Sequence, residues 1–519
     1  MGDTWVFGLI LLAVGLAATA AVLSNRLGAA VRVPAPALFL VGAALASDLV
    51  PALNSLSITT VERVVTVALA TILLDGGIHI GRRRFMAVAG PVVWLGVAGT
   101  LVTAVSLAAL AHLLFGFGWL PSLLLGTALA PTDPAVVFSV LGQREVTGRA
   151  GTLLEGESGA NDPVGIALMA ALLAAQGSGA AALGAGLLVF ALQMLVGAAV
   201  GVAGGWMLLT VMRRLPLPSE GLYPLRVLAL ALVVYGLAAA AHGSGFLAVF
   251  VAGIVIGDQS APYKREITRF IGALSSLAEI VAFVVLGLTV RLATLPDGGA
   301  WLIGLVLAVA LAFVVRPVLV GLVLLPVRLT RGERVFVLWS GLKGAVPILL
   351  GTFILGAHGV GDTLRLYDVI FVVVLFSVVV QGGLVPWVAA RCGVPMRQVR
   401  LEPWALGVRL RDEPAGVRQY LVVAGSAADG TAVAELAPDQ GLWIAMAVRD
   451  GMLLQVHGDL VLRAGDEVVV LAPDDGWDPA TLFAHGSKPP GRWTGDPPTR
   501  DDLDQDDEEA PSEHGQTPG

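Results

Sequence analysis

Polar and ionisable residues stand at four places in this sequence where the surrounding stretch is otherwise apolar. Each ionisable side chain near the centre of a bilayer costs about 2.5 to 3.5 kcal/mol on insertion scales, so those that persist are candidates for function. The candidate residues are Asp75, Thr132, Asp133, Glu157, Ser158, Asn161, Asp162 and Lys343.

The third of these places could bind an ion. Ser158 and Asp162 are four residues apart, so on a helix their oxygens share one face, and Glu157 and Asn161 form a second pair beside it. Hard oxygen ligands suit an alkali cation or a proton rather than a soft metal. Asp162 could bind either one, and competition for that carboxylate together with alternating access would produce obligatory exchange.

Two of the apolar stretches should be interrupted. Pro131 and Pro134 flank Thr132–Asp133 and cannot donate backbone hydrogen bonds, and Gly341, Gly344 and Pro347 loosen the stretch around Lys343. Broken backbone at membrane depth persists only where it lines a cavity or a binding site.

The elements that position these residues are predicted to be membrane helices. Of 519 residues, 56% are hydrophobic and only 14% are charged, which excludes an ordinary soluble enzyme. Residues 1–390 contain thirteen apolar stretches, the first at 5–24 and the last at 367–389, of roughly the 20 residues that a bilayer crossing needs. The single cysteine, Cys392, excludes a disulfide within the chain and a multi-thiolate metal site.

Counted along the chain, the two interruptions lie in the fifth and twelfth predicted spans. If spans one to six and eight to thirteen are two halves, the interruptions occupy corresponding positions in inverted repeats. That arrangement indicates the binding site of a secondary transporter.

The loop charges predict the orientation. Sixteen Lys and Arg residues lie in one set of alternate loops and three in the other, Arg63, Arg291 and Arg365. The positive-inside rule then places the N-terminus outside and the C-terminus in the cytoplasm.

The composition changes after residue 390. Residues 400–475 are predicted to form a small α+β domain with strands at 420–424, 442–448 and 467–471. Residues 485–519 are acidic and rich in Pro and Gly, which predicts a disordered tail.

Several ordered motifs resemble those of bacterial NhaP-type monovalent cation/proton antiporters, especially the potassium/proton antiporter subgroup. They are Leu-Leu-Asp-Gly-Gly at 73–77, Thr-Asp-Pro at 132–134, Glu157-Ser158-x-x-Asn161-Asp162-Pro163, Gly-Leu-Tyr-Pro at 221–224, Gly-Ser-Gly at 243–245 and Gly-Leu-Lys-Gly-Ala-Val-Pro at 341–347. The resemblance covers about residues 5–390. Residues 400–475 are similar to the C-terminal subdomain of RCK (TrkA-C) regulators of potassium transport.

The resemblance implies an all-α polytopic membrane protein of about 13 helices with inverted repeats and two broken crossing helices, followed by a small α+β domain. It implies a secondary antiporter that exchanges cytoplasmic K+ or Na+ for external H+. It also implies an inner-membrane homodimer with no cofactor and no nucleic-acid partner. The C-terminal domain would be a regulatory site for a small molecule or nucleotide, or else an element that serves only dimerisation and stability.

The resemblance also assigns roles to the candidate residues. Asp162 would be the essential ion-binding carboxylate, with Glu157, Ser158 and Thr132 completing the shell around an alkali cation. Asn161, which stands where other members carry a second Asp, indicates electroneutral exchange. Asp133 and Asp75 would support the site, and Lys343 stands where relatives usually carry Arg.

Other interpretations remain open for single residues. Asp162 could form a structural salt bridge with Lys343 or Arg316, and Asp75 could pair with Lys343. Glu279 lies at membrane depth, where it could tune selectivity or face a water-filled funnel.

Three other functions are also compatible with parts of the sequence. A Na+-selective exchanger of the same family is one, and a cation channel gated by the C-terminal domain is another. The string Gly156-Glu157-Ser158-Gly159 also matches a short motif of intramembrane serine proteases, with His242 as the base.

Overall fold

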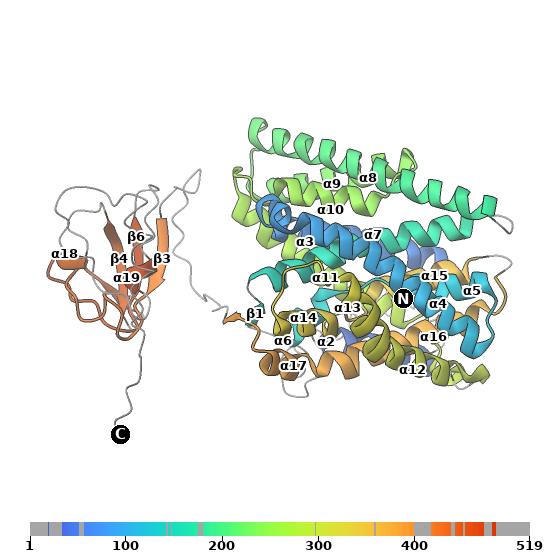
Figure 1. Cartoon of the computed structure of the whole chain (residues 1–519). Helices are drawn as coiled ribbons and strands as arrows, with labels where there is room; N and C mark the ends of the chain where they lie inside the picture. The colour runs from blue at the N-terminus through green and yellow to red at the C-terminus, as the bar shows by residue number, and fades with distance from the viewer. Residues whose placement is uncertain are drawn as a thin grey trace, which may run out of the picture. The chain divides into compact units, whose positions relative to one another are not determined.

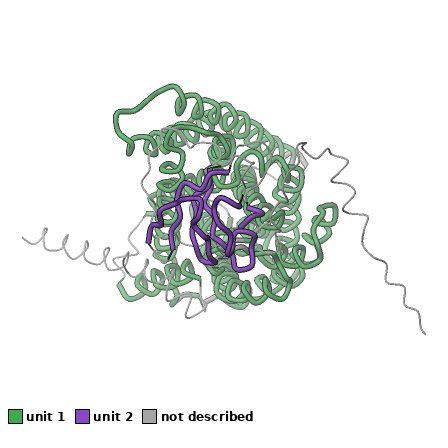
Figure 2. The backbone as a smooth tube through the Cα atoms, turned by 90° about the vertical axis from the view of Figure 1, so that its left-hand side faces the viewer, with its two compact units in different colours: residues 1–405 green, residues 406–519 purple. Residues whose placement is uncertain are grey.

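The computed structural model describes residues 19, 34–50, 57–141, 144–146, 148–174, 180–295, 297–357, 360–398, 417–436, 442–449, 452–471 and 480–483. The chain divides into two compact units, residues 1–405 and 406–519 (Figure 2). The predicted first span, apart from Thr19, and the predicted acidic tail lie outside the described residues.

The first unit is a bundle of apolar helices (Figure 1). Its α-helices are α2 (Ala35–Leu49), α3 (Ile58–Trp94), α4 (Thr100–Phe115), α5 (Trp119–Ala128), α6 (Pro134–Leu141), α7 (Gly148–Ala174), α8 (Ala180–Arg214), α9 (Leu222–Ala240), α10 (Gly245–Gly257), α11 (Lys264–Gly287), α12 (Ala300–Ala310), α13 (Gly321–Val323), α14 (Arg331–Trp339), α15 (Ala345–Leu355), α16 (Thr363–Phe376) and α17 (Val385–Cys392). Short π-helical or 3-10 segments are η2 (Leu95–Gly99), η3 (Leu292–Thr294), η4 (Asp297–Gly299), η5 (Leu311–Val320) and η6 (Ser377–Gln381).

Six helical segments in the described part of the chain are long and apolar enough to cross a membrane. They are 58–115, 184–214, 222–240, 264–287, 300–323 and 363–381. Four shorter apolar helices accompany them, namely α2, α5, α10 and α15. The predicted helical membrane fold is confirmed, and the number of thirteen spans stays a prediction.

Gly81 separates the predicted third and fourth spans. It interrupts α3 with φ 65° and ψ 165°, a left-handed conformation that glycine adopts without steric cost. The carboxylate of Asp258 accepts a hydrogen bond from the backbone N–H of Arg83 at 2.5 Å just after this kink. A side chain at position 81 would overlap Asp258, so the kink requires glycine.

Both predicted interruptions are present. The fifth span is divided into α5 and α6 by residues 129–133, and the twelfth is divided into α14 and α15 by residues 340–344. The half-helix α14 begins with a capping box in which Thr330 and Glu333 exchange hydrogen bonds.

The second unit contains a four-stranded antiparallel sheet in the order β3-β6-β4-β5. Its elements are β3 (Val417–Leu421), α18 (Val433–Leu436), β4 (Trp443–Arg449), β5 (Met452–Leu454), β6 (Glu467–Leu471) and α19 (Ala480–Phe483). One face buries a core that includes Ile444, Val468, Val470 and Phe483. The three predicted strands are confirmed within a few residues, and β5 was missed because three residues carry almost no periodic signal.

In the second unit a bidentate ion pair joins Arg449, the last residue of β4, to Asp466, the residue before β6. Arg449 donates from Nε to Asp466 Oδ1 and from a terminal nitrogen to Oδ2, both at 2.7 Å, and the backbone N–H of Arg463 donates to Oδ2 at 2.8 Å. Asp466 is fully buried. The hydrogen bonds from Arg449 lower the pKa of Asp466 below its ordinary value of 3.8.

We expect Asp466→Asn to destabilise the second unit by about 3 kcal/mol, because it leaves Arg449 without its charged partner in a partly buried position. Because the folded state lowers the pKa, the pair stabilises the fold above pH 3.8 and is lost as the pH falls below that value. Hydrogen exchange of β3, β4 and β6 in the whole protein measures both effects. Asp459→Asn, at an exposed position, is the control, and equal protection in the two variants would contradict the prediction.

Candidate functional site

The two interrupted helices meet at their breaks. The backbone N–H of Asp133 donates a hydrogen bond to the carbonyl of Leu342 at 2.8 Å, which joins the segment between α5 and α6 to the segment between α14 and α15. At this crossing Gly344 lies directly against Asp133, where an added Cβ would overlap the Asp133 carboxylate. The Asp133 carboxylate also accepts from the N–H of Ala135 at 2.9 Å, which fixes the start of α6.

Gly344→Ala is expected to lower transport about tenfold or more, because the added methyl group must displace either the Asp133 carboxylate or the crossing itself, and misplaced site groups cost about that much. Gly356→Ala, at the other end of α15, is the matched control, since its added Cβ approaches nothing closer than 3.8 Å. Ion flux in proteoliposomes measures the effect. Equal flux in the two variants would show that the crossing tolerates displacement.

Lys343 pairs with backbone carbonyls freed by the break. It is fully buried, and its Nζ donates to the carbonyl oxygens of Ala130 at 3.0 Å and Pro131 at 2.9 Å. Its own backbone N–H donates to Ser377 Oγ at 3.0 Å. Lys343 therefore supplies donors to two carbonyls just beyond the end of α5, which the interrupted helix leaves without helical partners.

Asn161 fastens α7 to the same break. Its Nδ2 donates to Thr132 Oγ1 at 2.7 Å, and its Oδ1 accepts from the backbone N–H of Thr132 at 3.3 Å. Both residues are buried. This pair of hydrogen bonds, one donated and one accepted by the same side chain, needs an amide, because an ionised carboxylate would have no proton to donate.

Asp162, the next residue on α7, has a buried carboxylate with one oxygen that no described residue hydrogen-bonds. It is 8% exposed, and its Oδ1 accepts no hydrogen bond from any described residue. Lys343 and Arg316, the two cations considered for a structural salt bridge, hydrogen-bond elsewhere in the described structure. A buried carboxylate without a donor must hold a proton or a cation to offset its desolvation.

Glu157, on the same helix, is held by Arg316. A terminal nitrogen of Arg316 donates to Glu157 Oε1 at 3.1 Å, with both side chains almost fully buried. Arg316 also donates from Nε to the carbonyl of Leu338 at 3.0 Å. Gly341 permits this approach, since an added Cβ there would overlap the guanidinium. One Glu157 oxygen is thus engaged, and Oε2 has no partner among the described residues.

Two further candidate carboxylates, Asp75 and Glu279, belong to α3 and α11. Asp75 Oδ1 is 3.1 Å from His79 Nδ1 one helical turn away, rather than paired with Lys343 as one hypothesis held. Gly272 of α11 lies against this pair. Glu279, two turns along α11, has a buried Oε1 with no hydrogen-bond partner in the described structure. Whether it tunes selectivity or faces a water-filled funnel stays a prediction.

The structure therefore brings together residues that the sequence motifs singled out. It also shows one contact that the motifs did not reveal. Thr132, Asp133, Asn161 and Lys343 join the two breaks to α7, and Ser158 is buried on α7. The pairing of Glu157 with Arg316 was not predicted. An arginine within an apolar stretch, directly before Pro317, was the signal available for it.

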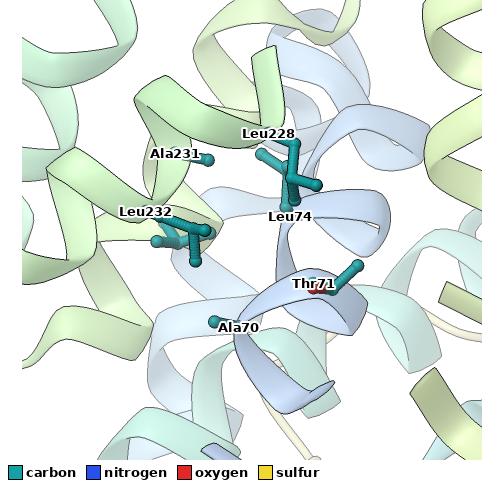
Figure 3. A pocket seen from close by; sticks show the side chains of 7 residues that line it. Ala70, Thr71, Leu74, Leu228, Ala231 and Leu232 are labelled. Carbon is teal, nitrogen blue, oxygen red and sulfur yellow. The ribbon is translucent and has the colours of Figure 1, made fainter. Parts of the chain in front are cut away.

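Two other features of the first unit do not form an ion site. A small recess between α3, α9 and α10 is lined by apolar side chains and Thr71, with Leu74 and Leu228 facing it (Figure 3). It contains no ionisable group. His242, the base of the protease hypothesis, is exposed in a turn with φ 59°, and no hydrogen bond joins it to buried Ser158 in the described structure.

Comparison with known families identifies both parts of the chain. The sodium/hydrogen exchanger transmembrane family matches residues 7–391, and the TrkA-C domain family matches residues 417–478. The chain therefore belongs to the sodium/hydrogen exchanger family and carries a TrkA-C domain. It is a cation/proton antiporter, a membrane transporter rather than an enzyme, as the sequence predicted.

Among curated proteins, the chain is similar to two potassium/proton antiporters. It is 33% identical to the K(+)/H(+) antiporter NhaP2 of Shewanella sp. (strain MR-4) over 80% of this chain and 72% of that protein. It is 37% identical to the K(+)/H(+) antiporter NhaP of Alkalimonas amylolytica over 62% of this chain and 56% of that protein.

Among solved structures, the sodium proton antiporter MjNhaP1 from Methanocaldococcus jannaschii at pH 8 superimposes with a TM-score of 0.61 at 22% identity. The superposition covers 74% of this chain and 99% of that one. This likeness supports the fold.

Proposed function

We propose that the protein exchanges cytoplasmic K+, or Na+, for external H+ at Asp162. The observation that carries this proposal is the buried Asp162 carboxylate, whose Oδ1 has no hydrogen-bond partner among the described residues, beside two interrupted helices that meet at Asp133 and Leu342. A carboxylate in this position is neutralised either by a proton or by a cation, so loading one requires release of the other.

The surrounding residues support a single exchangeable charge. Glu157 is ion-paired with Arg316, and Asn161 is a neutral amide that fixes Thr132. The Asp133 carboxylate accepts from the backbone N–H of Ala135, whereas Asp162 Oδ1 has no hydrogen-bond partner among the described residues, so we assign the exchangeable charge to Asp162. Asp162 then exchanges one cation for one proton, which makes the cycle electroneutral. Ser158, Thr132 and the free Glu157 oxygen supply the remaining oxygen ligands of the alkali cation.

We propose K+ as the preferred cation. The two curated relatives described above are named potassium/proton antiporters, and the second unit is a TrkA-C domain. We further propose that the protein is an inner-membrane homodimer with its N-terminus outside and its TrkA-C domain in the cytoplasm. The exchange itself needs no cofactor, and a small molecule or nucleotide acts on the TrkA-C domain.

Proteoliposomes test the proposal. The protein is reconstituted with an imposed pH gradient, and K+, Na+ or choline is added outside. We expect K+ to collapse the gradient most strongly, Na+ less and choline not at all, with no dependence on membrane potential. A gradient that persists with both alkali cations would overturn the exchange. Passage of K+ without proton movement would instead identify a channel.

A further inference from the structure

Phe250 of α10 is in tight contact with two glycines that belong to sequence motifs of the first unit. Its backbone carbonyl lies against Gly77 of α3, and its ring lies against Gly159 of α7. A Cβ added to either glycine would overlap Phe250. Helices α3, α7 and α10 pack against one another (Figure 1). Ion binding at Asp162 gives neither glycine a role, whereas the need to admit this one aromatic residue explains both.

The ring of Phe250 covers the turn of α7 that precedes Asp162. Glu155, Gly159 and Asp162 follow one another at spacings of four and three residues, so they share one face of the helix. The three atoms nearest to a Cβ added at Gly159 all belong to the Phe250 ring. Phe250 is 2% exposed, so its neighbours enclose the ring. An apolar group therefore occupies the face of α7 between Glu155 and Asp162.

The side chains on the Glu155 side of the ring are polar and accessible. Glu155 is partly exposed and interacts electrostatically with His79 of α3. The His79 side chain is 52% exposed and pairs with Asp75. On the other side of the ring, Asp162 Oδ1 is buried and has no hydrogen-bond partner among the described residues. The ring thus separates an accessible polar group from the buried carboxylate.

We propose that Phe250 is the apolar barrier that keeps exchange at Asp162 coupled. Apolar constrictions exclude water, and with it the path that protons would take. In alternating access the ion site opens to one side of the membrane at a time. A permanent water path past Phe250 would leave Asp162 open to the Glu155 side in every state. Protons would then cross without a cation whenever Asp162 opened to the other side. This inference rests on the proposed exchange at Asp162.

Phe250→Ala is expected to open such a path. The substitution removes the ring beside Gly159, which has no side chain of its own to fill the space. The space lies between the helical positions of Glu155 and Asp162, and a cavity with polar partners retains water, whereas an apolar cavity stays dry. We expect the proton flux without alkali cation to rise about tenfold or more, which corresponds to a barrier lowered by only about 1.4 kcal/mol.

Proteoliposomes with an imposed pH gradient, and choline as the only added cation, measure this leak. Phe246→Ala is the matched control, because it makes the same substitution about one turn away on α10, at a buried ring that packs edge-on against Tyr235. Phe250→Leu keeps a branched apolar side chain and should restore most of the barrier. Phe250→Ala combined with Asp162→Asn should show no leak, because the carboxylate that carries the proton is then absent.

Four outcomes would overturn the barrier. They are the absence of a leak in Phe250→Ala, an equal leak in Phe246→Ala, an equal leak in Phe250→Leu, and a leak that survives Asp162→Asn. Cation-driven flux in the unmodified protein separates this inference from the exchange on which it rests. Its absence would contradict the exchange itself, whereas normal exchange with no leak in Phe250→Ala would overturn the barrier alone.

Gly159→Ala tests the contact from the side of α7 while keeping the ring. The added methyl group must displace the ring, so we expect cation-driven exchange to fall about tenfold. Phe250→Leu in the same chain should recover it, because leucine lacks the outer ring atoms that the methyl group meets. Gly236→Ala of α9, where an added Cβ meets nothing within 4 Å, is the control. Equal exchange in the two alanine variants, or no recovery with leucine, would contradict the contact.

Discussion

Replacing Asp162 with asparagine is expected to lower cation/proton exchange by about a hundredfold or more. Asparagine has the size of aspartate, but it neither binds a proton at neutral pH nor carries a charge for a cation. Because no hydrogen bond from a described residue reaches Asp162 Oδ1, the substitution breaks no contact of that oxygen within the described structure, and the fold should remain intact. The effect should therefore appear in transport and not in stability.

Flux in proteoliposomes and thermal unfolding in detergent measure the two sides of this expectation. Asp362→Asn is the matched control: it makes the same substitution at the exposed N-cap of α16, where the Asp362 side chain accepts from the N–H of Arg365 and asparagine caps equally well. Normal transport by Asp162→Asn would remove Asp162 from the mechanism. A large loss of stability would show that its role is structural.

Replacing Lys343 with alanine is expected to destabilise the transmembrane unit by about 4 kcal/mol, because two buried carbonyls lose their charged donor. The carbonyls of Ala130 and Pro131 immediately precede Thr132, so transport should fall as well. Lys343→Arg keeps a positive charge and several donors and should recover part of both losses.

Thermal unfolding and flux again separate the effects. The control is Lys264→Ala, since Lys264 donates to a single carbonyl, that of Ile256, at the end of α10. We expect the control to lose clearly less stability than Lys343→Ala. Equal losses of stability would show that the hydrogen bonds from Lys343 to the carbonyls at the break stabilise the unit no more than the single bond from Lys264 does.

The sequence predicted the parts of the site that depend on local chemistry. Pro131, Pro134, Gly344 and Pro347 restrict or loosen the backbone directly, so the positions of both interruptions follow from the residue types themselves. The neighbours of Asp162 along α7 follow from helix spacing in the same way. The β-strands of the TrkA-C domain follow from alternating hydrophobicity and turn residues.

Contacts between distant segments could not be predicted from the chain. The nitrogen atoms of Arg316 reach Glu157 across 159 positions, and Lys343 reaches Ala130 across 213. No local pattern encodes which of several buried cations faces which acceptor, and hypotheses pairing Lys343 with Asp75 were equally compatible with the sequence. Strands of three residues, such as β1 (Arg144–Val146) and β2 (Met396–Gln398), are likewise specified by tertiary packing.

The central claim is that one carboxylate alternately holds a proton and a cation. Proton release from the purified protein in weakly buffered detergent solution tests it most directly, on addition of K+, Na+ or choline. The account predicts about one proton released per chain with the transported cation, the ratio a single binding carboxylate imposes, no release with choline, and none from Asp162→Asn. Cation binding without proton release, or undiminished release from Asp162→Asn, would contradict it.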